Sequence, residues 1–206
     1  MGYYSTLVTT NFESAIELDD EGHEGREHGF RDLEQGSYLP PFWTALFEIT
    51  DICSANSECI EGGSRYTFIA PKRKALELLM QRKQVLLNIF GAQHARRITL
   101  FHDFISSGKG NNVLMDPSQL IEVSDHPPSF RDELVYCLQR INGLTPEVTE
   151  LLIPRVPTNL IERIFPKPPH RHVIGTDLGY TDFAAFVADP GLLTGTNTQG
   201  TPWDSL

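Results

Sequence analysis

The sequence predicts a single α+β domain, rich in helix, with a small sheet and a Gly/Thr-rich C-terminal tail. Three observations lead to this fold class. The chain has 206 residues, which is about the size of one domain. Residues 72–90 repeat apolar side chains at helical spacing. Short runs of aromatic and β-branched residues at 3–9 and 65–69 are typical of strands. We therefore expect a globular domain over residues 1–188 and a tail over residues 189–206.

The strongest predicted helix lies between Pro71, which suits the first turn of a helix, and Gly91, which ends it. Its expected apolar face comprises Leu76, Leu79, Met80, Leu86, Leu87 and Phe90. A second helix is expected over 92–106, so that the two helices form a hairpin or a kinked pair around Gly91. Its expected inward residues are Ala95, Ile98, Phe101, His102 and Ile105. A further helix is predicted over 130–142, after a capping residue at Ser129.

Several segments carry a weaker pattern. Residues 42–52 are apolar enough for a buried helix or a strand, and periodicity does not decide between the two. Residues 17–34 and 54–64 are polar and are expected to be loops. The tail at 189–206 is poor in apolar residues, so we expect it to be mobile unless an apolar side chain docks on the domain. The candidates for docking are Leu192, Leu193 and Trp203.

Charge is distributed in blocks along the chain, whose formal net charge is −10. Residues 1–70 hold thirteen acidic and three basic residues, whereas residues 71–110 hold eight basic and two acidic ones. Residues 111–206 are acidic again. The acidic excess disfavours nucleic acid and anionic membranes as partners, because both are bound through clustered Lys and Arg. We expect the basic charges of the middle block to line the solvent face of a helix and to pair with the acidic blocks.

The densest acidic run extends from Glu17 to Glu34 and is the predicted partner-binding surface. An acidic field of this kind accelerates association with a basic protein. The residues predicted to contact a partner are Asp19, Asp20, Glu21, Glu24, Glu27, Tyr38 and Trp43. The last two, with Phe42, are aromatic residues next to the acidic run and could anchor an interface. Packing in the core is the alternative for these aromatic side chains.

No catalytic residues, metal ligands or cofactor are predicted. His23 and His28 are five residues apart, whereas a zinc-protease helix requires histidines four apart. The three cysteines are an odd number, which argues against a disulfide framework and favours reduced thiols. A small hydrolase or transferase built on His94, His102 and Asp103 remains an alternative, as does an assembly adaptor.

The absence of an apolar leader or an 18-residue apolar run predicts a cytoplasmic protein without a membrane span. Acidity, small size and the lack of a catalytic set together favour a non-enzymatic binding protein. We expect a bacterial immunity or inhibitor protein that neutralises a toxin, plausibly through a basic toxin domain. The oligomeric state is left open.

Overall fold

The structure is a computed structural model that describes residues 4–13, 30–36, 39–56, 64–117, 135, 138 and 193–196. The strands are β1 (Tyr4–Thr10), β2 (Asp32–Gly36), β3 (Ile52–Asn56), β4 (Ser64–Pro71) and β5 (Asn112–Asp116). The helices are α2 (Pro41–Thr44), α3 (Lys72–Phe90) and α4 (Ala95–Ser107), with 3-10 turns η2 (Ile49–Asp51) and η3 (Ala92–His94).

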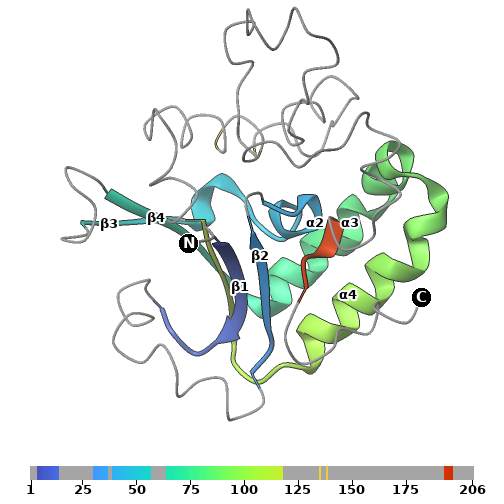
Figure 1. The fold of residues 1–206 in the computed structure, drawn as a ribbon. Coiled ribbons are helices and arrows are strands. Elements are labelled where there is room, and N and C mark those ends of the chain that lie inside the picture. Colours follow the sequence, from blue (N-terminus) through green and yellow to red (C-terminus); the bar gives the residue numbers. More distant parts are fainter. Residues whose placement is uncertain are drawn as a thin grey trace, which may run out of the picture.

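The five strands form one antiparallel sheet in the order β2-β1-β5-β4-β3. Figure 1 shows α3 and α4 packed together on the same side of this sheet, with α2 nearby. The α+β prediction is therefore confirmed. Among the described residues, no helix is both long enough and apolar enough to cross a membrane.

Three strands lie where no strand was predicted. β5 occupies the centre of the sheet between β1 and β4 and is buried from Val113 to Asp116. β3 overlaps the predicted loop 54–64, because its residues complete a hydrogen-bonded ladder with β4. β2 overlaps the acidic run, and within it Leu33 is fully buried. Its neighbour Asp32 is buried as well, whereas Glu34 and Gln35 are half-buried.

Helix α3 begins and ends where the sequence predicted. The Lys72 backbone N–H donates to the carbonyl of Asn111, and Gly91, with φ of 104°, ends the helix. The predicted apolar face was wrong in one position, because Met80 is 42% exposed. A charged residue, Arg82, is instead buried on the core side. The helix pair around Gly91 is confirmed, with η3 inserted at the start of α4.

The predicted face of α4 is confirmed for Ile98, Phe101 and Ile105, which are buried. His102 is only partly buried, with 29% of its side chain exposed. Arg97 is buried on this helix. The expectation that the basic charges all line a solvent face was therefore wrong for two arginines, one on each helix.

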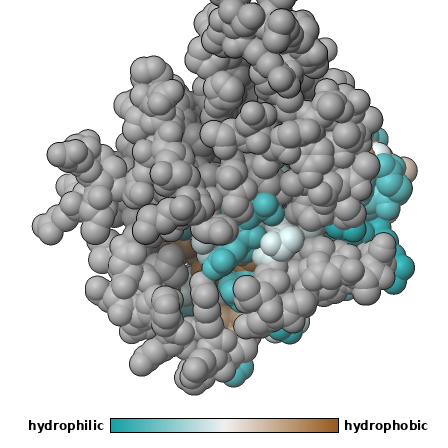
Figure 2. Space-filling view, in the orientation of Figure 1, coloured by the Kyte–Doolittle hydropathy of each residue, from teal (hydrophilic) through white to brown (hydrophobic). Residues whose placement is uncertain are grey.

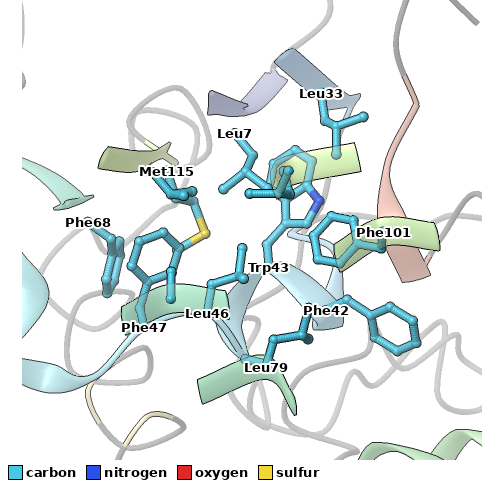
Figure 3. Packing of buried hydrophobic residues seen from close by; sticks show 14 of the residues in the cluster. Leu7, Leu33, Phe42, Trp43, Leu46, Phe47, Phe68, Leu79, Phe101 and Met115 are labelled. Carbon is cyan, nitrogen blue, oxygen red and sulfur yellow. The ribbon is translucent and has the colours of Figure 1, made fainter. Parts of the chain in front are cut away.

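The ambiguous segment 42–52 forms neither one helix nor one strand. It contains most of α2, a turn, η2 and the first residue of β3. The large side chains of Phe42, Trp43, Leu46 and Phe47 are fully buried and form much of the core between sheet and helices. Figure 3 shows their side chains among residues of β1, β2, β4, β5 and α4. Phe42 also makes an edge-on contact with Phe90, with ring centroids 5.9 Å apart.

Part of the predicted tail belongs to this core. Leu193 is fully buried and packs in the core cluster, so one of the three side chains predicted to dock on the domain does so. Thr196 forms an isolated antiparallel bridge with Glu34 of β2. Residues 193–196 of the predicted tail therefore contact the domain, and the rest of residues 189–206 lies outside the described residues. In the predicted helix 130–142, Val135 and Leu138 are helical, and the rest lies outside the described residues.

Candidate functional site

Most of the acidic run lies in the connection between two paired strands, and its last three residues, 32–34, belong to β2. β1 and β2 are antiparallel neighbours, yet twenty-one residues separate the end of one from the start of the other. Hairpin connections usually have about two to five residues, and much longer ones are commonly functional or disordered. Residues 14–29 of this connection hold six acidic residues and one arginine. The predicted contacts Asp19, Asp20, Glu21, Glu24 and Glu27 fall in this segment, which lies outside the described residues, as does Tyr38.

The two ends of this connection are fastened to each other. The Thr9 backbone N–H donates to the Arg31 carbonyl at 2.8 Å. In return, the Arg31 backbone N–H donates to the Thr9 hydroxyl, also at 2.8 Å. This pair of bonds prolongs the β1–β2 ladder to the point where the connection leaves the sheet, so the connection starts and ends at one place.

The outgoing end is also fastened to the start of β5. The Asn11 side-chain oxygen accepts a hydrogen bond from the Asn111 backbone N–H at 3.2 Å. The Asn112 side-chain amide donates to the Phe12 carbonyl at 2.8 Å. Gly110, with φ of 95°, lies so close to Thr10 that a Cβ on it would be 2.6 Å from that residue's carbonyl atoms. The base of the connection is therefore a compact corner of main chain and short polar side chains.

Basic side chains gather around the same corner. The Arg31 guanidinium lies over the Phe104 ring, 5.2 Å from its centroid, and its Nε donates to the Ser107 hydroxyl. The Lys72 ammonium donates to the Gly108 carbonyl at 2.7 Å and so neutralises the C-terminal end of α4. Both cations therefore have a structural role in joining α4 to the sheet and to α3.

The described residues do not share the acidity of the whole chain. They contain ten basic and eight acidic residues, whereas the rest contains seven basic and nineteen acidic residues. The sheet and helices are thus close to neutral, and the negative charge lies in the segments joined to them. Figure 2 shows that hydrophilic residues make up much of the coloured surface on this face of the molecule.

Trp43 is not a surface anchor, which corrects its predicted role in partner binding. The side chain is fully buried, and its indole N–H donates to the Thr194 carbonyl at 2.9 Å. In Figure 3 the indole lies among Leu7, Leu33 and Phe101. Phe42 is also fully buried. The alternative of core packing is therefore the correct one for these two aromatic residues, because both are buried residues of α2 and belong to the core cluster.

The residues of the enzyme alternative are not brought together. His102 Nδ1 lies 3.1 Å from Asp103 Oδ1, but these are neighbours in sequence on an exposed part of α4. His94 is 7% exposed and precedes α4. The two histidines are eight positions apart, which corresponds to roughly 12 Å of rise along a helix.

A buried cation and an ion-pair cluster, which the sequence reasoning missed, hold the turn between α2 and β3. The Arg82 guanidinium is 3% exposed and donates through Nη1 to the Ala45 and Phe47 carbonyls, at 2.9 and 2.7 Å. Burial lowers the pKa of Arg82, while the charges of Glu48 and Asp51 oppose this shift. The sequence did contain a signal for this burial. Arg82 lies three residues after Leu79 and four residues before Leu86, which places it on the buried face of α3.

Next to it, Lys74 Nζ lies 2.7 Å from Asp51 Oδ1 and 2.9 Å from Glu48 Oε2. Although burial opposes the charged form, these hydrogen bonds raise the pKa of Lys74. The hydrogen bond from Lys74 to Glu48 lowers the pKa of Glu48. This pairing of the basic block with the N-terminal acidic block agrees with the expectation from the sequence. Burial, helped by Asp51, raises the pKa of the nearby Cys53 thiol, which disfavours a reactive thiolate.

Comparison with protein-family models, with curated proteins and with solved structures found no match to this chain. Within the described ranges, no three His, Cys, Asp or Glu side chains are grouped so as to hold a metal ion. The acidic connection between β1 and β2 is the candidate binding segment, because its two ends are anchored at one corner of the described fold. Its anchored base can present a negatively charged segment to a cationic partner.

Proposed function

We propose that this chain is a non-enzymatic binding protein, namely a bacterial immunity or inhibitor protein of the cytoplasm that neutralises a toxin through its acidic connection. The partner would carry a basic surface, as expected for a toxin domain that acts on nucleic acid. The proposal rests mainly on the connection between β1 and β2, which carries most of the acidic run and whose two ends are joined by hydrogen bonds between Thr9 and Arg31.

The fastened base supports this proposal energetically. A segment closed at both ends has fewer conformations to lose on binding than a free tail, and this lowers the entropic cost of association. The near neutrality of the described body supports it electrostatically, because the body does not cancel the field of residues 14–29. Acidic fields of this kind raise association rates by about 10- to 1000-fold at low salt.

The first test is capture of the tagged, full-length chain from its native host. The proposal expects one partner in near-stoichiometric amount, with a basic surface. Recovery of several unrelated partners, or of the chain itself, would instead favour an assembly adaptor.

The second test measures the association rate with the captured partner. Reversal of Asp19, Asp20 and Glu24 to Lys should lower the rate by at least about tenfold at low salt. The difference should shrink near 1 M salt, where the Debye length is about 3 Å. A control reverses Glu77 and Asp103, whose side chains are 59% and 66% exposed on the described body. Equal rates for the triple variant and this control would contradict a role for the acidic connection.

A further inference from the structure

The outer edge of β2 is paired by a segment from the far end of the sequence. The Glu34 backbone N–H donates to the Thr196 carbonyl at 2.8 Å, and the Thr196 N–H donates back to the Glu34 carbonyl at 3.2 Å. The Thr196 hydroxyl lies 3.3 Å from the same carbonyl. The two residues are 162 positions apart. Residues 193–196 thus begin an additional antiparallel pairing at a strand that ends the sheet order.

Trp43 forms the floor beneath this segment. Its indole N–H donates to the Thr194 carbonyl, and a Cβ on Gly195 would lie 2.5 Å from Trp43 Cζ2. Gly195 has φ of 71°, which L side chains rarely adopt. Leu193 is fully buried in the core cluster. In Figure 1 this short red segment lies close to α2, on the helix side of β2.

These contacts resemble those that hold a bound peptide. Main-chain groups of Thr194 and Thr196 make the hydrogen bonds, one apolar side chain fills the core, and a glycine permits close contact with an indole. Main-chain pairing at a sheet edge supplies affinity, and side-chain pockets supply specificity, when proteins bind extended peptides. None of these interactions depends on the segment being covalently joined to the domain.

We infer that the edge of β2 and the indole of Trp43 form a recognition site for a peptide of the pattern Leu-Thr-Gly-Thr, which turns at the glycine and pairs with the strand edge through its last residue. In this chain the site is occupied by its own residues 193–196. The same segment supplied as a separate peptide replaces the tethered one when the latter is displaced. The site is distinct from the acidic connection and does not rest on the proposed function.

The test uses the full-length chain with Trp203→Phe, so that Trp43 is the remaining tryptophan. Gly195→Val, added to this chain, forces the segment off the indole, and the Trp43 emission should shift to the red. A peptide of residues 190–200 should reverse the shift saturably, with half-saturation at or below about 1 mM, since tethered segments have effective concentrations in the millimolar range. The control peptide carries Val in place of the glycine.

Thr196→Pro provides a second, milder variant, because it removes one donor at an exposed residue. It should show a smaller red shift that the native peptide also reverses. Failure of the peptide to restore the emission of either variant would overturn the inference. Loss of the far-ultraviolet circular dichroism signal in both variants would overturn it too, because the segment would then be inseparable from the core.

Discussion

Arg82 is the residue whose replacement tests the tertiary structure most directly. Its guanidinium is buried and donates two hydrogen bonds to the main chain of the turn that follows α2. Arg82→Met keeps an unbranched side chain of similar length but leaves the carbonyls of Ala45 and Phe47 without this donor. Both of these residues are fully buried.

The expected cost follows from these contacts. Hydrogen bonds that involve a charged group contribute about 1.5–3 kcal/mol each, so two of them give about 3–6 kcal/mol. Relief from burying a charge offsets part of this sum by a few kcal/mol. We expect a net loss of about 3 kcal/mol in the free energy of unfolding. For a chain of this size, that lowers the Tm by roughly 6–12 °C.

The assay is urea unfolding followed by tryptophan fluorescence, with Arg73→Met as the matched control. Arg73 lies on the same helix with 91% of its side chain exposed, and its Nε is 3.8 Å from Glu77 Oε1. Its replacement should change stability by no more than about 0.5 kcal/mol. The reasoning is refuted if the two variants unfold at the same urea concentration with equal slopes.

Three further predictions concern the corner, the ion-pair cluster and the core. Gly110→Ala should lower the free energy of unfolding by about 2 kcal/mol, because its φ is positive and its Cβ would strike Thr10; an unchanged urea midpoint would contradict this. The bond from Lys74 lowers the pKa of Glu48, so the stabilisation is present above the ordinary value of 4.5 and is lost as pH falls below it. Unfolding measured between about pH 7 and pH 3 should therefore be less pH-dependent in Glu48→Gln, and parallel curves would count against the bond. Phe42→Ala should cost about 3–5 kcal/mol in urea unfolding, since the ring is fully buried; a loss below about 1 kcal/mol would place it outside the core.

The helical part of the fold could be predicted because its signals are local. The proline at 71, the apolar spacing and the glycine at 91 define α3 within the sequence itself. β1 and β4 could be predicted within one or two residues for a similar reason, because their aromatic and β-branched composition favours extended backbone.

The remaining strands could not be predicted, because their stability comes from neighbours far away in the sequence. The composition of most of β3 is typical of a polar loop, and the segment is a strand because it pairs with β4. β5 is a five-residue stretch whose central place depends on pairing with β1 on one side and β4 on the other. A short strand gains little from its own composition and much from the ladder that it completes.

The candidate site divides in the same way. The sequence by itself determined the charge blocks and the acidity of residues 14–29, since formal charge is a property of composition. Only the tertiary structure placed Trp43 in the core, buried Arg82 against a turn, and joined residues 193–196 to the edge of β2. Burial and main-chain pairing are set by which surfaces meet, and contacts across 30 to 160 residues leave no periodic signal in the chain.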